Sequence, residues 1–595
     1  MSGRSFLIFI LFFNYTLALA NDSPALELEP IIVIKSNPHI ADYYSLDSHD
    51  SDYPGNSILE ILDLLPLDLQ SRSPKKSLQS DFSLRGSTYQ GVSLLLGNAR
   101  INDPQTAHHN CDIPVTAEDI EKIEIIPGAS SSLFGPDAIG GAVNIQIKKP
   151  RVDKTIFELS GGSHKTNSGI FSLTRKIDNW GFRISSESES SDGFYYDTDF
   201  KKLVNRLDSS LEFANGEFNL GFGYQEKEFG AYDFYTPGLG YPSKEWTKTY
   251  LLNSGLVLEN EDFIFKPGFL WRSHYDKFML DKTQSRSTYL NHHHTDIYTP
   301  SLYLQKDIEI LGKVGLGLEY GEESINSTNL GKHGRRHKSI FIVQDKDLNS
   351  KSALRLSFRC DDFRGFECLY TGASNLRFDC SESHSLNFGI GNNVRIPSFT
   401  ELYYNDPTTQ GNESLSEEKA LNYQLGYGYK KEGLTSGIVF FLRQEKDMLD
   451  WVKADPSQAK WQIENIKETE VKGIETYLKF SLDSNFSWDV YYTYINKRII
   501  GQDYLYKYGP SYMRHLVSNR FQLDLPFGRQ VITAIYKKRP ARRGWFLLDT
   551  YFNCRVHKNA QLFLNITNIL NVEYQEIEGI PQPGRWIEAG FRLEW

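Results

Sequence analysis

Two runs of histidine in this sequence raise the question of metal chemistry. His292, His293 and His294 are consecutive, and His108 and His109 come directly before Asn110 and Cys111. Neighbouring side chains of an extended chain point in opposite directions, so adjacent histidines cannot easily ligate one ion together. We therefore expect both runs to belong to loop structure, and a metal or metal-chelate contact stays open as the alternative.

Three aspartates lie close together in a second polar segment, SSDGFYYDTDF. Asp192, Asp197 and Asp199 carry oxygen ligands at spacings that one loop could gather around Ca²⁺. Asp-Gly turns are common without any ion. A structural calcium ion is therefore the one cofactor that the sequence suggests, with an ordinary turn as the alternative.

Catalytic chemistry has little support in the sequence. No pairing of an acidic residue or a serine with histidine stands out as a candidate catalytic group. The segment GASSSLFG, residues 128–135, lacks the Gly-Lys-Ser/Thr ending that places a lysine on a phosphate, which argues against a P-loop. We expect no enzyme.

The region 82–147 predicts a small α+β unit interrupted by glycine. Short apolar strands are expected at 92–96, 123–126 and 142–147, separated by turns that use the backbone freedom of glycine. Thr116 and Asp119 resemble a capping box before the second of these strands. Upstream, apolar residues at helical spacing predict a helix over 56–65, with Asn56 as its cap and Pro66 ending it.

The long remainder of the chain alternates between apolar and small or polar residues. Phe218, Leu220 and Phe222, for example, alternate with Gly221 and Gly223. The net charge of −10 and the lack of a long apolar run beyond the N-terminus favour a soluble protein at first sight. Long strands with this two-residue period are instead typical of a lipid-facing barrel wall around a wet lumen, although a soluble β-sandwich also alternates over shorter strands.

The length of this alternating region sets the size of the barrel. At roughly 20 residues per strand and connection, residues 151–595 supply about 22 strands, a number whose lumen is wide enough to hold another domain. The predicted fold class is therefore mainly β: an antiparallel transmembrane β-barrel of about 22 strands, whose lumen has room for the N-terminal α+β unit.

The first residues have the layout of a secretory signal peptide. Arg4 precedes an apolar core at 6–13, and Ala18-Leu19-Ala20 offers small residues for cleavage. We interpret residues 1–20 as removed on export, with an uncleaved anchor as the alternative.

The glycine-rich unit resembles the plug domain of TonB-dependent outer-membrane transporters. No single motif is specific, but their order along the chain is. The residues that carry the resemblance are Leu84, Arg85, Gly86, Gly128, Gly135, Gly140, Gly141 and Asn144. Residues 393–403, 471–475 and 565–574 are similar to barrel segments of the same family, and the terminal aromatic residue, usually Phe in the family, is Trp595 here.

The resemblance divides the chain and identifies a coupling segment. It implies a signal peptide (1–20), a periplasmic tail (21–48), a plug (49–150) and a barrel (151–595). The tail resembles a TonB box, an extended segment that pairs with an edge strand of the energy-coupling protein. The alternative is that it forms the first strand of the plug. The box residues are Glu29, Pro30, Ile31, Ile32, Val33 and Ile34.

The family's activity is energised import across the outer membrane. The resemblance implies that a scarce, bulky nutrient, cobalamin or a ferric siderophore, is bound outside and moved to the periplasm, and we favour the cobalamin-receptor branch. The implied partners are TonB, outer-membrane lipid and a small metal-chelate ligand, with no nucleic acid and a monomeric chain. The alternative is a ligand-binding or adhesion barrel without energised transport.

Strand parity predicts which connections face outward. These are segments 229–246, 274–298, 361–367, 401–418 and 504–512. Aromatic residues there could stack on an organic ligand, with interfacial anchoring or packing of the loop on itself as the alternative. The ligand-binding candidates are Tyr232, Phe234, Tyr235, Tyr403 and Tyr404. Because the envelope is oxidising, Cys360 and Cys368 are candidates for a disulfide across one loop.

Overall fold

The computed structural model describes residues 45–47, 57–284, 290–483, 485–501 and 503–595. The predicted signal peptide and the predicted TonB box at residues 29–34 lie outside these described residues.

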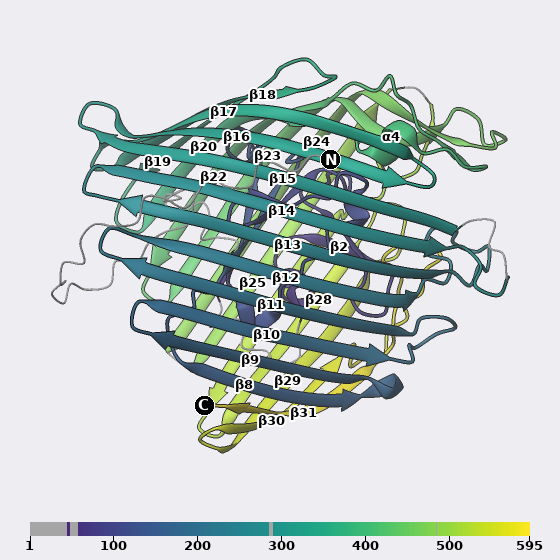
Figure 1. Ribbon diagram of the computed structural model, residues 1–595, viewed down its shortest axis with the longest axis horizontal. Helices are drawn as coiled ribbons and strands as arrows, with labels where there is room; N and C mark the ends of the chain where they lie inside the picture. The colour runs from purple at the N-terminus through teal and green to yellow at the C-terminus, as the bar shows by residue number, and fades with distance from the viewer. Residues whose placement is uncertain (1–44, 48–56, 285–289, 484, 502) are drawn as a thin grey trace, which may run out of the picture.

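The larger part of the chain forms a closed antiparallel β-barrel of 22 strands, which confirms the predicted fold class (Figure 1). Two further two-residue strands, β21 (Thr409–Gln410) and β26 (Leu505–Tyr506), lie in its connections. The wall strands are β8 (Lys154–Gly162), β9 (Asn167–Ile177), β10 (Trp180–Ser191), β11 (Phe200–Phe213), β12 (Gly216–Gly230), β13 (Lys244–Glu259), β14 (Phe263–Met279), β15 (Leu290–Ile308), β16 (Gly312–Ser327), β17 (Gly331–Asn349), β18 (Ser352–Phe363), β19 (Leu369–Asp379), β20 (His384–Arg395), β22 (Glu418–Lys431), β23 (Leu434–Lys453), β24 (Trp461–Asp483), β25 (Phe486–Ile500), β27 (His515–Leu525), β28 (Gly528–Lys538), β29 (Trp545–His557), β30 (Ala560–Thr567) and β31 (Trp586–Glu594).

The ring closes between β31 and β8, which pair antiparallel from Glu588 opposite Gly162 to Glu594 opposite Ile156. The backbone of Trp595 continues the seam, because its carbonyl accepts a hydrogen bond from the Thr155 amide at 2.7 Å. Every wall strand thus has a neighbour on both sides, as a strand in lipid requires, since hydrocarbon offers no partner for a bare N–H.

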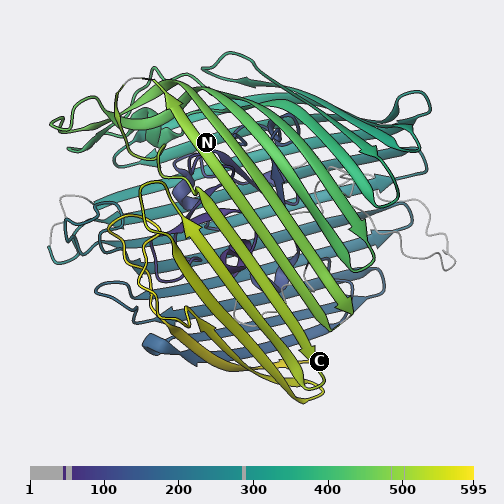
Figure 2. The same ribbon diagram turned by 180° about the vertical axis from the view of Figure 1, so that it is seen from behind.

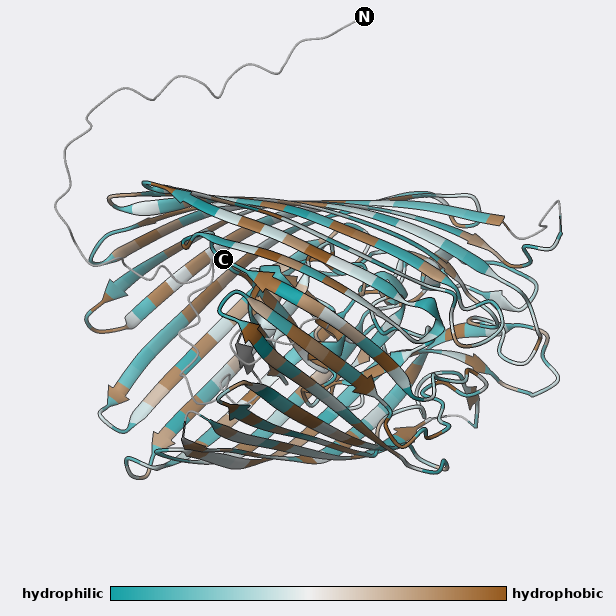
Figure 3. Cartoon of the chain, turned by 90° about the horizontal axis from the view of Figure 1, so that it is seen from below, coloured by the Kyte–Doolittle hydropathy of each residue, from teal (hydrophilic) through white to brown (hydrophobic). Residues whose placement is uncertain are grey.

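Apolar and polar residues alternate along the strands of the wall (Figure 3). On β12, Phe218, Leu220 and Phe222 are 38–41% exposed, whereas Gly221 and Gly223, which alternate with them, are buried. Exposed apolar residues alternate with buried small or polar residues along the other strands as well, which confirms the predicted lipid-facing surface.

The connections between wall strands are of two kinds. Successive strands are joined alternately at opposite ends of the barrel, with short turns such as 214–215 and 432–433 at one end and most of the long connections at the other. The β12–β13, β14–β15, β18–β19, β20–β22 and β25–β27 connections, predicted to face outward, all lie at the long-loop end.

The plug lies within this ring, where the purple ribbon is visible between the strands from both sides (Figures 1 and 2). Its mixed sheet has the order β1-β6-β7-β4-β5, in which β4 and β7 run parallel. The strands of the plug are β1 (Ser45–Asp47), β2 (Asp68–Ser71), β3 (Ser80–Ser83), β4 (Val92–Leu96), β5 (Ala99–Arg100), β6 (Ile120–Pro127) and β7 (Gly141–Ile147), of which β2 and β3 form a separate pair. All three strands predicted for this unit are present.

Helices are short. They are α2 (Ile58–Leu62), α3 (Ser131–Phe134) and α4 (Phe399–Tyr403), with 3-10 turns η2 (Ala107–His109), η3 (Ala117–Asp119) and η4 (Ser163–Lys165). In the described part of the chain, no helix has the length and apolar character needed to span a membrane.

The predicted helix over 56–65 is too long. It begins at Ile58, because Ser57 is the cap: the Ser57 hydroxyl accepts a hydrogen bond from the Glu60 amide, and the Glu60 carboxylate accepts one from the Ser57 amide at 3.1 Å. Asn56, the predicted cap, is not among the described residues. The capping box predicted at Thr116 and Asp119 is confirmed, and it starts η3.

Candidate functional site at the plug–barrel interface

The surface of the plug that faces the wall is held by ion pairs. Most of the charged groups are almost completely buried, and they come from strands all around the ring, so the plug is tied to its wall on several sides. The pairs, given as plug residue and wall residue, are Asp63–Lys537, Asp68–Arg539, Lys75–Glu588, Arg85–Glu475, Arg100–Glu323, Asp103–Arg272, Asp112–Lys227, Glu118–Arg592 and Asp119–Arg183.

Arg85 of the Leu-Arg-Gly motif makes one of the most enclosed of these contacts. Its guanidinium donates to both carboxylate oxygens of Glu475 on β24, at 2.6 and 3.0 Å, and lies 4.5 Å from the ring centre of Phe441. Arg85 and Gly86 adopt positive φ angles of 50° and 71°, which turn the chain sharply toward the wall. Two separate sequence motifs therefore meet here, since Glu475 ends the Val-Lys-Gly-Ile-Glu segment.

The remaining motif residues build the plug itself. A Cβ atom at Gly140 would lie 2.2 Å from the Leu84 carbonyl oxygen, so only glycine fits. Asn144 accepts a hydrogen bond from the Asn98 amide at 3.0 Å. From the wall, the Asn393 side chain donates to the carbonyl of Gly128 at 2.8 Å. Gly128, Gly135 and Gly141 have positive φ angles. These contacts show that the motif residues shape the plug and hold it against the wall.

His108 and His109 face different partners. Nδ1 of His108 lies 2.6 Å from Asp81, and its ring stacks on Tyr89 with centroids 4.3 Å apart. Burial favours neutral histidine and outweighs the attraction of Asp81, lowering the pKa of His108 to about 4. His109 points toward Asp112 and Asp276 instead. The two neighbours thus do not share one site, in agreement with the prediction.

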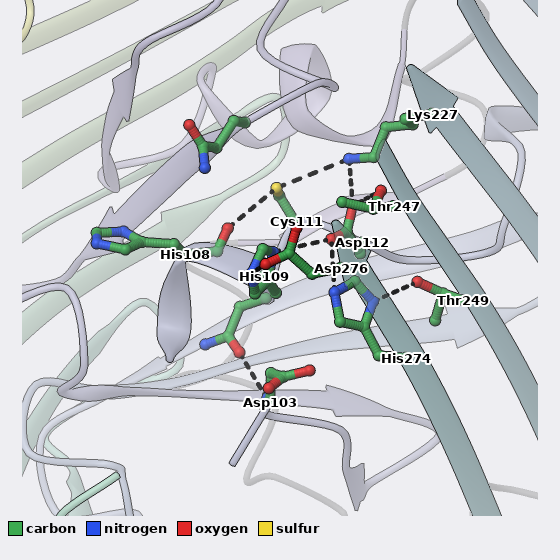
Figure 4. A network of polar contacts seen from close by, with 12 residues as sticks. Asp103, His108, His109, Cys111, Asp112, Lys227, Thr247, Thr249, His274 and Asp276 are labelled. Atoms are coloured by element: carbon green, nitrogen blue, oxygen red, sulfur yellow. Dashed lines mark hydrogen bonds and ion pairs between the residues drawn. The ribbon is translucent and has the colours of Figure 1, made fainter. Parts of the chain in front are cut away.

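His109 is at the centre of a second buried cluster that crosses from plug to wall (Figure 4). Its Nδ1 lies 3.4 Å from Asp112 of the plug and its Nε2 lies 3.5 Å from Asp276 on β14. His274 Nε2, also from β14, is 3.6 Å from Asp112. Burial alone raises the pKa of Asp112, but Lys227 and His109 outweigh it and hold that pKa well below its usual range.

Sequence reasoning did not single out His274 and Asp276. The available signal was their spacing of two, which places both side chains on the same face of a strand. The run 292–294 lies in strand β15 and not in a loop, because the pairing of β14 with β15 extends to Leu290. His293 faces inward toward Asp276, while His294 stacks on Tyr275 outside, with ring centroids 4.0 Å apart.

The aromatic residues predicted to bind ligand are spread over the long-loop end. Phe234 is buried and packs against Phe200 and Phe229 at the ends of β11 and β12, so its ring is not available to a ligand. Tyr235 reaches the apex of the plug, where it lies near His108 with ring centroids 6.0 Å apart. Tyr232 contacts Tyr195 and Tyr196.

The other two predicted tyrosines lie on and next to α4. Tyr403 stacks on His333, with ring centroids 3.5 Å apart and nearly parallel planes. The Tyr404 hydroxyl donates to Asp406 at 3.2 Å. These residues are not brought together in one site with Tyr232 and Tyr235, although all lie at the same end of the barrel.

Asp192, Asp197 and Asp199 are not gathered around one point. Asp192 pairs with Lys165 at 2.6 Å and Asp197 pairs with Lys282, so lysines neutralise two of the three carboxylates. Among the described residues, the groups with metal-ligand geometry do not include them. A calcium site here stays a prediction.

The Cys360 and Cys368 sulfur atoms lie 2.6 Å apart at the base of the β18–β19 connection. The fold therefore brings together the pair that the sequence suggested. Cys111, by contrast, is buried beneath the plug apex with its sulfur 3.6 Å from the Leu78 carbonyl oxygen.

A cavity of about 610 Å³ lies between the plug and the wall at the short-turn end. Its lining includes Gly97 and Gln146 from the plug, Pro150 from the link to β8, and Leu302 and Phe341 from the wall. The body of the plug lies between this cavity and the aromatic residues at the long-loop end.

The architecture defines a class: a β-barrel of the outer membrane filled by its own N-terminal domain. The sequence profile described as "TonB dependent receptor-like, beta-barrel" matches residues 152–569, and the "TonB-dependent Receptor Plug Domain" profile matches residues 47–142. The chain therefore belongs to the TonB-dependent receptor family, which comprises transporters and receptors of the Gram-negative outer membrane.

Individual relatives are distant. The vitamin B12 transporter BtuB of Vibrio vulnificus (strain YJ016) is 23% identical over 448 residues, covering 70% of this chain and 69% of its own. BtuB of Photobacterium profundum is 23% identical over 473 residues, covering 75% of this chain and 74% of its own.

Solved structures show the same fold. The siderophore receptor PirA from Acinetobacter baumannii superimposes with a TM-score of 0.76 at 12% identity, covering 95% of this chain and 100% of its own. The ferric yersiniabactin uptake receptor FyuA from Yersinia pestis gives 0.75 at 13% identity, covering 94% and 98%.

Proposed function

We propose that this protein binds cobalamin or a ferric siderophore at its long-loop end and imports it into the periplasm with force supplied by TonB. The observation that carries the proposal is the plug held inside a closed barrel by polar contacts. A filled barrel needs a displacement step before a bulky solute can pass, and an ion-paired interface can exchange its contacts for water when it is pulled apart.

The preferred nutrient is cobalamin. The sequence relatives described above, which cover 70–75% of this chain, are vitamin B12 transporters. The structural neighbours are siderophore receptors, but at 12–13% identity they support the fold alone. Tyr235, which is 37% exposed and lies near His108 at the plug apex, supplies an aromatic surface on which an organic ligand can stack.

The proposed orientation in the membrane has the short-turn end, where the link from β7 enters the wall at β8, facing the periplasm. In that orientation the tail that precedes the plug can reach TonB. The long connections, with Tyr232, Tyr403 and Tyr404, then face the medium. The box at Glu29 to Ile34 would pair with TonB by strand addition, in which backbone hydrogen bonds supply the affinity.

A binding screen tests the ligand. Purified full-length protein is titrated with cyanocobalamin, haem and ferric enterobactin, and quenching of tryptophan fluorescence is recorded. We expect saturable quenching by cyanocobalamin. Saturation by ferric enterobactin only would assign the siderophore branch, and no binding to any of the three would reject the proposed nutrients.

A coupling variant tests the energised step. Ile32→Pro removes a backbone donor from the proposed box, so uptake of the bound nutrient is expected to fall to background while its Kd is unchanged. Ile32→Val keeps the donor and is the matched control. Uptake by Ile32→Pro equal to that of Ile32→Val would contradict the assignment of the box.

A further inference from the structure

The His109 cluster has the dimensions of a metal site. One ligand atom each from His109, Asp112 and His274 lie within 4.8 Å of one another, and all three residues are buried. The His109–Asp112 and His274–Asp112 separations are 3.4 and 3.6 Å. Both are long for hydrogen bonds of buried groups. Ligand atoms bound tetrahedrally at about 2.0–2.2 Å from Zn²⁺ are themselves separated by about 3.3–3.6 Å.

His274 is a buried histidine with one ring nitrogen that has no hydrogen-bond partner among the described residues. The side chain is 0% exposed, and its Nδ1 lies 2.9 Å from the Thr249 hydroxyl. In the part of the chain that the structure describes, Nε2 makes no hydrogen bond, although it faces Asp112. If Nδ1–H donates to Thr249, Nε2 presents its lone pair to the cluster, as a metal ligand must.

The groups around the three ligands also fit a metal site. Asp276 lies 3.5 Å from Nε2 of His109, so its negative charge favours the tautomer that carries the proton on Nε2 and leaves Nδ1 free for the ion. Lys227 pairs with the second oxygen of Asp112 and helps keep that carboxylate ionised. In the absence of metal, a protonated His109 between Asp112 and Asp276 can satisfy the same charges.

We propose that His109, Asp112 and His274 bind a divalent transition-metal ion, Zn²⁺ being the best match, at the junction of plug and wall. Two histidine nitrogens and a carboxylate oxygen form a ligand set that Zn²⁺ accepts, and three protein ligands leave one coordination position open. Asp276 is a positioning residue. Because two ligands come from the plug and one from β14, the site is complete only when the plug is seated, and the ion therefore favours that state.

The test is a Zn²⁺ titration of the full-length protein. The protein is purified with an affinity tag that contains no histidine and is treated with EDTA to remove bound metal. We expect one tight equivalent by calorimetry or chelator competition. His274→Ala and Asp112→Asn should each weaken it at least about 100-fold, and Asp276→Asn about 10–100-fold, as for other residues that orient a ligand. His557→Ala, at the short-turn end, is the matched control and should leave binding unchanged.

A second measurement keeps the test independent of folding defects in the variants. Crystals of the wild-type protein soaked in Zn²⁺ should show anomalous scattering at the zinc edge between His109, Asp112 and His274. The proposal is overturned if the wild type binds Zn²⁺ no more tightly than His274→Ala, or if no anomalous peak lies there. It is also overturned if Glu245→Gln abolishes binding and His274→Ala does not, since Glu245 belongs with His109 and Asp276 to the neighbouring group. None of these measurements depends on which nutrient is imported.

Discussion

The plug buries side chains in two places, its own core and its contact with the wall, and the two differ in the polarity of the residues they bury. The core contains Ile123, Ile125, Val143 and Ile145, each at most 1% exposed, packed with other apolar side chains. The contact with the wall is equally buried, but beside apolar clusters such as Leu95 and Phe134 with Tyr303 and Phe341 it carries many ion pairs, which the core lacks. Apolar packing holds only while water is excluded, whereas paired charges can be rehydrated. The plug can therefore separate from the wall more readily than it can unfold.

Breaking one partner of a buried pair should have the largest effect. Arg85→Ala leaves the Glu475 carboxylate buried without its guanidinium, at an expected cost of about 3–5 kcal/mol. Urea unfolding with hydrogen exchange should show faster exchange along the plug surface near β24, with the β6–β7 amides still protected. The double variant Arg85→Met/Glu475→Gln should recover most of the loss, and a single variant as stable as the wild type would contradict this view of the interface.

The core should respond differently. Ile125→Ala removes methyl groups from a site that is 0% exposed, at an expected cost of roughly 2–5 kcal/mol. The same exchange experiment should show loss of protection throughout β6, β7 and β4 and not only at the surface. If Ile125→Ala and Arg85→Ala gave the same exchange pattern, the plug would unfold whenever it leaves the wall, and the distinction between core and interface would have no consequence.

Acid offers a graded way to weaken the interface. Burial raises the pKa of Asp63, but Lys537 and Lys76 outweigh it and lower that pKa from 3.8 to about 2. The resulting stabilisation is complete above pH 3.8 and is lost as the pH falls toward 2, with a total of about 2 kcal/mol.

Asp63→Asn isolates this contribution. Other carboxylates titrate in the same range, so the informative quantity is the difference in unfolding free energy between the wild type and Asp63→Asn. That difference should shrink between pH 4 and pH 2. A constant difference would show that Asp63 does not depend on its lysine partners.

The smallest effect is expected for an exposed pair of similar geometry. Lys165 and Asp192 are 2.6 Å apart, as are Arg85 and Glu475, but their side chains are 82% and 63% exposed. Lys165→Ala should therefore cause no measurable change in unfolding, because water and salt screen such pairs. A loss as large as that of Arg85→Ala would mean that burial does not distinguish the two pairs.

Much of the fold was predictable because its signal is periodic and local. The alternation at residues 218–225 fixes which face of β12 meets lipid, and the length of the alternating region gives the number of strands. The plug strands were predictable for the same reason, since short apolar runs are bounded by glycine. The cap at Ser57 was missed because two adjacent polar residues could both serve, and the choice depends on where Glu60 falls.

The candidate sites were harder, because their members are brought together only by the closed ring. Asp112 and His274 are far apart in the sequence, and the residues between them carry no common pattern. The aromatic residues show the same limit: Phe234 and Tyr235 are neighbours, yet one is buried in a cluster and the other reaches the plug apex. Strand parity predicts the end of the barrel at which a loop lies, but it does not predict the direction of each side chain within the loop.

The seam between β8 and β31 has a consequence for biogenesis. The plug is translated before any wall strand, and the two strands that join at the seam are the earliest and latest of the 22. Until β31 pairs with β8, any sheet that the wall strands form has two unpaired edges and an apolar outer surface. Enclosure of the plug must therefore coincide with, or come before, the joining of those edges, and a mutation that delays the joining would leave the cell with exported chains that are prone to aggregate.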